Sequence, residues 1–290
     1  MMFLIRRAAS VLRWTAGGWS CMAAGIQRSG GRGMASIRDR AVSILELLAG
    51  HPQGLALSAI ADQLDMPRAA AHRVLGDLKD GGYVRQAGAG EYYRLTAKIV
   101  SLGFAYLAHN GVVEMAQPVL DRLAGDSGEL ARLAVLNGEE LRWIAKAQGA
   151  TSGLRYDPDN GAVVGLMAAA NGHAWLACLD DDSAIRIVAR QQIPRESFGP
   201  GAPADLAALL ETLAPVRRQG YASVRDSYEL GTASVAAAIR DPRSGAPVGT
   251  VSIAGPTSRM PDERLGELAR LVINAAQELS ALVGAAKLMA

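Results

Sequence analysis

Apolar and polar positions alternate most regularly between residues 57 and 95. Over residues 59–64, apolar residues recur at helical spacing. Ser58 is a suitable N-cap for this helix because its hydroxyl can accept from the free N–H groups of the first turn. Asp65-Met66-Pro67 predicts a turn, since Pro suits the first position of a following helix. A second helix is predicted over residues 67–79, and the pair indicates a helix-turn-helix.

The second helix has two different faces. Ala71, Val74, Leu75 and Leu78 recur at i, i+3, i+4 and i+7 and should face the core. The opposite face combines small residues, which allow a helix to sit deep in a major groove, with side chains that reach bases or phosphates. Gly76 lies on this face, and close approach to DNA would explain a glycine there. The residues of this face are Arg68, Ala69, His72, Arg73 and Gly76.

A hairpin is predicted directly after this helix. Two strand-like runs, residues 83–85 and 91–95, flank Gly88-Ala89-Gly90, which reads as the tip of a wing. Arg85 and Arg94 lie near the stem of the wing. We expect DNA contacts from Arg68, Ala69, His72, Arg73, Arg85 and Arg94. The alternative is a winged-helix dimerisation module whose basic face is merely solvated.

Two further helices should flank the winged helix. Residues 36–50 carry an apolar stripe and should pack behind the second helix. Thr96 is a suitable N-cap for a helix over residues 97–108. Its apolar seam of Ile99, Leu102 and Tyr106 requires a partner, and a second copy of the chain is the natural one.

From residue 112 onward the pattern changes to mixed helices and strands. Asn137-Gly138 is a strong signal for a type I′ hairpin. One antiparallel sheet with helices on its faces is the expected architecture, so the fold class is α+β. The predicted strands are residues 131–136, 141–146, 153–157, 221–225, 235–240 and 248–254. The predicted helices are residues 113–123, 171–179, 182–191, 205–218 and 262–283.

Composition restricts the class of protein. The 290 residues carry a net charge of only +2, so any DNA affinity must come from local clustering. The two cysteines, Cys21 and Cys178, fit a reducing cytoplasm. No apolar run reaches the ~20 residues that cross a bilayer, so we expect no membrane contact. Residues 1–34 are basic and contain no acidic residue, which predicts either a disordered extension or an over-called start preceding Met34.

Five stretches together resemble one known family. They are MPRAAAHRVL, GGYVRQAGAGEYYRL, GLMAAANGHAWLA, GYASVRDSYELGTASVAAAI and TVSIAGPTSRMPDERL. Their order and spacing resemble the isocitrate lyase regulator (IclR) family of bacterial transcription factors. The resemblance implies a winged helix-turn-helix over residues 35–95, a linker helix over 96–111 and a GAF/PAS-like effector-binding domain over 112–284. Family members bind small, usually carboxylated metabolites, so the resemblance implies such a ligand here.

A carboxylate site requires N–H donors and a positive local field, both of which the start of a helix supplies. Residues 168–172 are small and should leave their backbone N–H groups accessible. Hydroxyl groups and an apolar wall would complete the pocket. The expected effector-binding residues are Leu166, Met167, Ala170, Asn171, Val224, Ser234 and Ser252. The alternative is that these residues simply fill a core.

Departures from the family pattern leave the effector open. Ser234 stands where many members carry cysteine, and Met167 replaces a frequent histidine. Val224-Arg225 stands where an acidic residue is common. Arg225 would favour a more anionic ligand if it faced the pocket, but alternation along a strand allows only one of the two to do so.

Catalytic chemistry finds little support. The four histidines are scattered without metal-ligand spacing, and no phosphate-binding glycine loop follows a strand. We therefore predict no catalytic residue, metal site or cofactor. The expected function is a cytoplasmic, ligand-responsive regulator, most simply a repressor of a catabolic operon, that binds operator DNA as a homodimer or dimer of dimers. The alternative is a metabolite-converting enzyme with a GAF-like domain and an accessory winged helix, which would consume its ligand.

Overall fold

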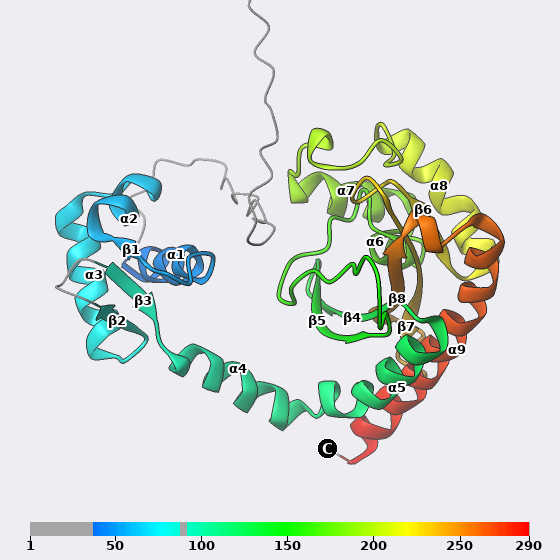
Figure 1. Ribbon diagram of the computed structural model, residues 1–290, viewed down its shortest axis with the longest axis horizontal. Helices are drawn as coiled ribbons and strands as arrows, with labels where there is room; N and C mark the ends of the chain where they lie inside the picture. Colours follow the sequence, from blue (N-terminus) through cyan, green and yellow to red (C-terminus); the bar gives the residue numbers. More distant parts are fainter. Residues whose placement is uncertain (1–36, 88–91, 290) are drawn as a thin grey trace, which may run out of the picture. The chain divides into compact units, whose positions relative to one another are not determined.

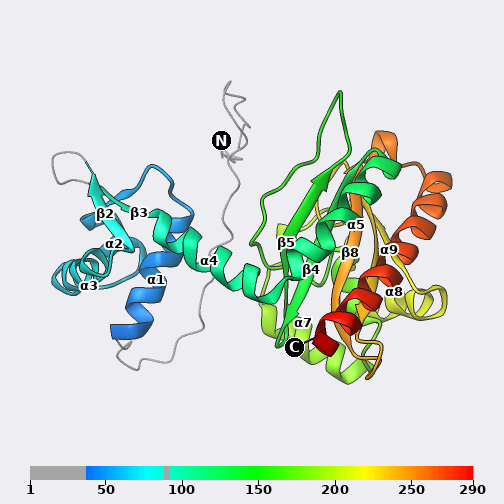
Figure 2. The same ribbon diagram turned by 90° about the horizontal axis from the view of Figure 1, so that it is seen from below.

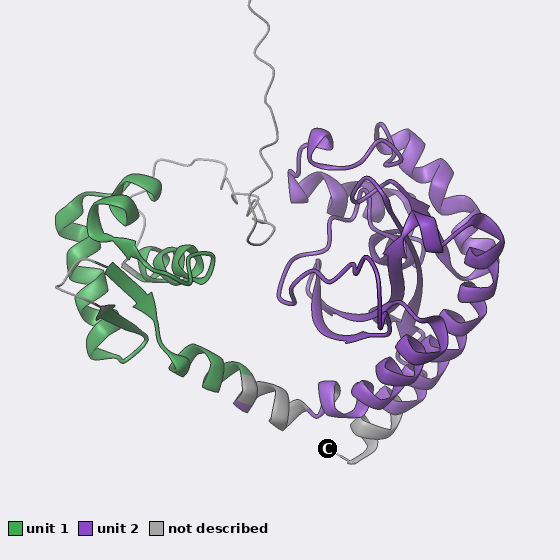
Figure 3. Cartoon of the chain, in the orientation of Figure 1, with its two compact units in different colours: residues 1–103 green, residues 104–290 purple. Residues whose placement is uncertain are grey.

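A computed structural model describes residues 37–87 and 92–289. The predictions for residues 1–34 and for the wing tip, residues 88–90, lie outside the described residues. The chain divides into two compact units, residues 1–103 and 104–290 (Figure 3). Each unit has its own buried core and is described by itself.

The described part of the first unit contains three helices and a small sheet, followed by the helix that leads into the second unit (Figure 1). Its three strands are antiparallel in the order β1-β3-β2. Ile44, Leu48, Ile60 and Leu75 are fully buried between the helices and this sheet. The elements are α1 (Ile37–Ala49), β1 (Leu55–Ala56), α2 (Leu57–Gln63), α3 (Arg68–Asp80), β2 (Val84–Ala87), β3 (Tyr92–Leu95) and α4 (Ala97–Asn110).

Of the two N-caps predicted for this unit, one is wrong and one is confirmed. Ser58 is not the N-cap of α2, because β1 runs directly into the helix and places Ala56 at the cap without a side-chain hydrogen bond. Thr96 does cap α4: its hydroxyl oxygen accepts from the Lys98 backbone N–H at 3.2 Å. The Lys98 ammonium also donates to the Gly81 carbonyl at 2.7 Å, which fastens the start of α4 to the turn after α3.

The second unit is built on a five-stranded antiparallel sheet in the order β5-β4-β8-β7-β6. Its strands are β4 (Leu130–Asn137), β5 (Glu140–Gln148), β6 (Ala222–Arg225), β7 (Thr232–Arg240) and β8 (Pro247–Pro256). Its helices are α5 (Val112–Ser127), α6 (Ala170–Leu176), α7 (Asp181–Gln191), α8 (Leu206–Gln219) and α9 (Asp262–Met289), with short 3-10 turns η1 (Arg195–Ser197) and η2 (Thr257–Arg259). This architecture confirms the α+β prediction.

The two faces of the large sheet are covered differently. α5 and α9 lie along one face, where Leu133, Val235 and Ile253 form the main core (Figure 2). α6 packs on the opposite face, against β6, β7 and β8, with α7 and α8 beyond it. Because side chains alternate along each strand, residues two apart share the α6 face.

Two predictions for the second unit are wrong. Residues 153–157 form no strand: Gly153 has φ +74°, and side chains of β5 hold the segment, since Gln148 donates to the Tyr156 carbonyl and Lys146 to the Asp157 carboxylate. The β4–β5 turn is not type I′, since its two loop residues are Gly138 and Glu139 and only Gly138 has positive φ. Glycine at the first loop position fits type II′.

Within the described ranges 37–87 and 92–289, no helix is both long and apolar enough to span a membrane.

Candidate functional site

The helix α3 separates its faces as its sequence predicts. Ala71, Val74, Leu75 and Leu78 are buried against the core of the first unit. The predicted DNA-contacting residues on the opposite face are all exposed, namely Arg68, Ala69, His72 and Arg73. Gly76 lies on that side too, and a Cβ added there would meet no atom within 4 Å. Packing inside the domain therefore gives no reason for this glycine.

The stem of the wing presents two arginines. Arg85 on β2 is exposed, and it is paired in register with Arg94 on β3. Arg94 is half-buried: its stem packs against Gly54, while its Nε is buried without a hydrogen-bond partner among the described residues. Tyr92 shares this face by alternation along β3, and 46% of it is exposed.

The linker helix α4 carries exposed apolar side chains. Leu102 is 51% exposed and Val100 is 53% exposed, whereas Ile99 is half-buried. The side chain of Tyr106, the third member of the predicted seam, lies outside the described residues. Because residues three apart share a helix face, Leu102 lies on the same side as Ile99 and continues the predicted seam, whereas Val100 lies on the opposite side.

Five of the predicted effector residues meet on the α6 face of the large sheet. Val224 on β6 pairs with Ser234 on β7, and Ser252 lies on β8, which neighbours β7. Ala170 and Asn171 begin α6, and the Asn171 amide donates to the Thr250 hydroxyl of β8 at 2.9 Å. Ser252, Ala170 and Asn171 are buried, while Val224 and Ser234 are half-buried.

The orientation of Arg225 is now defined. Its neighbour Val224 shares the α6 face, so Arg225 points to the opposite side of the sheet. There its guanidinium donates to the Met260 carbonyl at 2.6 Å and to the Asp262 carboxylate at 2.8 Å. Arg225 therefore adds no positive charge to the predicted effector site.

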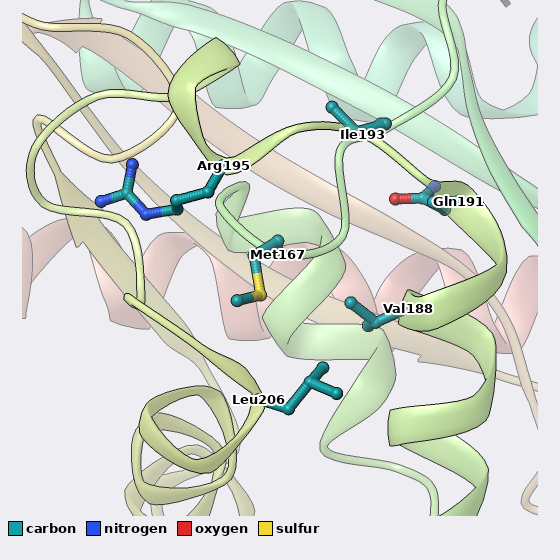
Figure 4. Close-up of a pocket in the computed structure, with 6 residues that line it drawn as sticks. All are labelled: Met167, Val188, Gln191, Ile193, Arg195 and Leu206. Atoms are coloured by element: carbon teal, nitrogen blue, oxygen red, sulfur yellow. The ribbon is translucent and has the colours of Figure 1, made fainter. Parts of the chain in front are cut away.

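The other two predicted effector residues lie towards α7 and α8. Leu166 is fully buried in the cluster between the sheet and these helices. Met167 lines a cavity of about 100 Å³ (Figure 4). The polar groups of its lining are hydrogen-bonded to the backbone: the Gln191 amide to Val164 and Leu166, and the Arg195 guanidinium to the carbonyls of Pro203 and Ala202. The cavity therefore offers mainly apolar surface. Its lining residues are Met167, Val188, Gln191, Ile193, Arg195 and Leu206.

Part of the predicted carboxylate cradle is wrong. The backbone N–H groups of Ala168 and Ala169 both donate to the Gly165 carbonyl, at 3.2 and 3.0 Å, so they are not accessible. The helix α6 is only seven residues long, which limits its dipole.

His173, in the same helix, is buried, and this burial lowers the pKa of its ring. The ring Nε2 lies 3.0 Å from the Met167 carbonyl, and this contact opposes the lowering of the pKa. His173 is therefore neutral near pH 7.

A residue of the α6 face that the sequence analysis did not select is Arg132 on β4. It is 2% exposed and pairs in register with Ser252. Burial lowers the pKa of Arg132 to about 10, opposed by acidic groups nearby that include Asp157 and Glu229. The signal was present in the sequence: Arg132 is the one charged residue in the apolar run of residues 130–136.

Comparisons with known proteins agree with these two units. The model described as the IclR helix-turn-helix domain matches residues 39–88, and that described as the bacterial transcriptional regulator IclR C-terminal domain matches residues 104–281. The chain is 34% identical over 242 residues to the HTH-type transcriptional regulator BhcR of Paracoccus denitrificans, covering 83% of this chain and 85% of that protein. It is 28% identical to the transcriptional repressor IclR of Escherichia coli, covering 84% and 89%.

A solved structure shares the fold along most of the chain. It is an IclR homologue from Microbacterium hydrocarbonoxydans complexed with 4-hydroxybenzoate, and it is 23% identical with a TM-score of 0.71, covering 86% of this chain and 100% of that one.

These matches decide between the two functional classes. Members of the matched family regulate transcription and are not enzymes, so the enzyme alternative is wrong. The same matches give the N-terminal unit a DNA-binding helix-turn-helix and the C-terminal unit an effector-binding domain. The chain belongs to the IclR family of bacterial transcriptional regulators.

Proposed function

We propose that this regulator is a cytoplasmic repressor whose affinity for operator DNA changes when it binds a small carboxylated metabolite. The observation that carries the proposal is the division of α3 into a buried apolar stripe and an exposed face bearing Arg68, His72 and Arg73. An exposed basic helix face backed by a rigid core is what reading a major groove requires. Repression is supported by the name of the Escherichia coli relative.

Roles follow from position on the first unit. Arg73 and His72, with Arg68 and Ala69 at the start of α3, face the base edges. Arg85 and Arg94 contact phosphates, because they lie at the stem of the wing rather than on the helix that enters the groove. Phosphate contacts fix the register on the duplex, whereas base contacts select the sequence.

The effector binds on the α6 face of the large sheet. Asn171, Ser234 and Ser252 supply polar contacts there, Ala170 and Val224 supply apolar wall, and Leu166 and Met167 close the side towards α7. The complex of the Microbacterium hydrocarbonoxydans homologue with 4-hydroxybenzoate supports a carboxylate as the ligand.

For a ligand to control DNA binding, the assembled protein must have two arrangements of its subunits, and the ligand must bind one of them more tightly. Pairing of two chains through the exposed apolar side of α4 gives a homodimer, or a dimer of dimers, that presents two winged helices to one operator. A ligand that prefers one arrangement of this assembly changes its affinity for paired half-sites.

Selection from a random duplex library tests the DNA-binding half of this proposal. The full chain should enrich one sequence with two related half-sites, and footprinting should protect both. If no sequence is enriched, or if the enriched sequence contains only one half-site, the protein is not a dimeric operator-binding repressor. Adding a panel of small carboxylates to the enriched duplex then tests the response, with release of DNA as the expected result.

A further inference from the structure

The α6 face of the large sheet holds a buried positive charge, that of Arg132, with acidic groups nearby but no ion pair among the described residues. No ion pair of the described residues includes Arg132, although 98% of this residue is covered. Its Nη2 donates to the Asp159 carbonyl at 2.9 Å, while its Nε is buried with no hydrogen-bond partner. A buried charge is expensive to remove from water and is normally paired with an opposite charge.

A neighbouring buried charge shows the usual solution. Glu129, three residues before Arg132, is as deeply buried. Both of its carboxylate oxygens accept from the Arg259 guanidinium, at 2.6 and 2.7 Å. The buried charge of Glu129 is therefore neutralised by a bidentate ion pair. Among the described residues, no carboxylate forms such a pair with Arg132.

A second unsatisfied donor adjoins Arg132. The Arg132 guanidinium carbon lies 3.9 Å from the centre of the Trp143 ring, and the indole Nε1 of Trp143 is also buried without a partner. Buried N–H groups in native proteins nearly always have an acceptor, so two from touching side chains point to an acceptor that binds beside them.

The side chains around Arg132 and Trp143 indicate what kind of ligand would bring that acceptor. The Tyr228 ring meets Trp143 edge-on at 5.6 Å, and Phe198 lies 5.9 Å from Tyr228. These rings form an aromatic wall beside the guanidinium. Ser252, the register partner of Arg132, adds a hydroxyl group on the same face.

We propose that Arg132 and Trp143 are the anion-binding half of the effector site, where Arg132 Nε and Trp143 Nε1 donate to the carboxylate of a small ligand with a flat or apolar body. This inference rests on the proposed function and names the groups that select charge within it. A planar guanidinium matches a carboxylate in both charge and geometry. An uncharged amide of the same shape offers no charge to compensate Arg132 and should bind more weakly.

Thermal melting of the full chain with simple probes tests the proposal. The probes are sodium formate, acetate and benzoate, each compared with its amide and with sodium chloride at equal ionic strength. We expect at least one carboxylate to raise the Tm saturably while its amide does not. Trp143→Phe keeps an aromatic ring, although a smaller one, and removes one donor, and Arg132→Met removes the charge. Both should weaken carboxylate binding about 10-fold or more, because a hydrogen bond to a charged group is lost.

Arg225→Met is the matched control, since it removes an arginine from the opposite side of the same sheet and should leave carboxylate affinity unchanged. If Arg132→Met does not fold, as circular dichroism would show, Trp143→Phe and the amide comparison decide. Equal affinity of carboxylate and amide, no carboxylate binding to the natural chain, or unchanged affinity in the variants that fold would overturn the inference.

Titration of the selected duplex separates this inference from the proposed function. Carboxylate binding that depends on Arg132 but does not alter DNA affinity would support the inference and contradict the proposed function. If a carboxylate releases DNA from the natural chain and from Arg132→Met alike, the proposed function is supported and the role of Arg132 is contradicted.

Discussion

Arg85 on β2 and Arg94 on β3 are direct cross-strand partners in the wing sheet. Partners in register point to the same side, so two positive charges face one another there. Like charges directly opposite destabilise a sheet. A phosphate bound at this side would remove that repulsion, which suits the pair to the DNA backbone rather than to base edges.

Replacing Arg85 with alanine should therefore weaken all DNA binding without changing sequence preference. We expect equal losses on the selected duplex and on a scrambled one, and a salt slope lower by about one. Relief of the repulsion should leave the DNA-free protein as stable as before or slightly more so. Arg122→Ala, in the second unit, removes the same charge and serves as the control. A loss confined to the selected duplex would show that Arg85 reads sequence.

The recognition helix could be predicted from sequence because its information is local. Amphipathic spacing alone identified Ala71, Val74, Leu75 and Leu78 as buried, and the structure places all four in the core. The remaining face then follows by elimination. The N-cap of α2 was harder, because the pairing of β1 with β3 fixes where that helix begins, and such pairing joins residues far apart in the sequence.

The effector site was only partly predictable for the same reason. Val224, Ser234 and Ser252 could be grouped because neighbouring strands were foreseen. Arg132 could be recognised as a charge in an apolar strand, but its isolation depends on tertiary contacts. The Asp159 carbonyl follows residues 153–157, which were predicted as a strand and form none. The hairpin that carries Trp143 was predicted, but its register, which shifts between Leu133 and Ala134, was not.

The glycine on the groove side of α3 provides a sharper test of DNA contact. Gly76→Ala should stabilise the DNA-free first unit by up to about 1 kcal/mol, because alanine favours a helix and the added methyl group meets nothing. DNA affinity should nevertheless fall, since the methyl group would meet the duplex. Gly125→Ala, a helical glycine of the second unit with equally open surroundings, should leave DNA affinity unchanged. Unchanged DNA affinity in Gly76→Ala would remove close approach as the reason for this glycine.

The exposed apolar side of α4 predicts how chains assemble. Leu102→Lys should change the stability of a single chain by no more than about 0.5 kcal/mol, because Leu102 is 51% exposed there. At an interface the same lysine would be a buried unpaired charge, so sedimentation should show smaller species and operator binding should weaken. Ser101→Lys adds the charge one position away and is the control. An unchanged mass for Leu102→Lys would exclude this side of α4 from the interface.

Charge at the start of α6 should decide ligand binding. Asn171→Asp keeps an oxygen that can accept from the Thr250 hydroxyl, but it places a negative charge on the predicted effector face. Repulsion should abolish carboxylate binding and leave DNA affinity intact, as isothermal titration and duplex titration would show. Thr250→Val breaks the same hydrogen bond without adding charge and should lower stability by about 1–3 kcal/mol while ligand binding persists. Carboxylate binding to Asn171→Asp at full affinity would place the ligand elsewhere.

Arg73 is the residue through which α3 should read a DNA sequence. Its side chain is exposed on the face opposite the buried stripe, so Arg73→Ala leaves the core untouched. The decisive measurement is the affinity of Arg73→Ala and of the natural chain for the selected duplex and for a scrambled duplex, at several salt concentrations. We expect Arg73→Ala to lose about 1–3 kcal/mol of binding free energy on the selected duplex and much less on the scrambled one. Equal losses on both duplexes at every salt concentration would contradict this expectation, because Arg73 would then contribute charge alone.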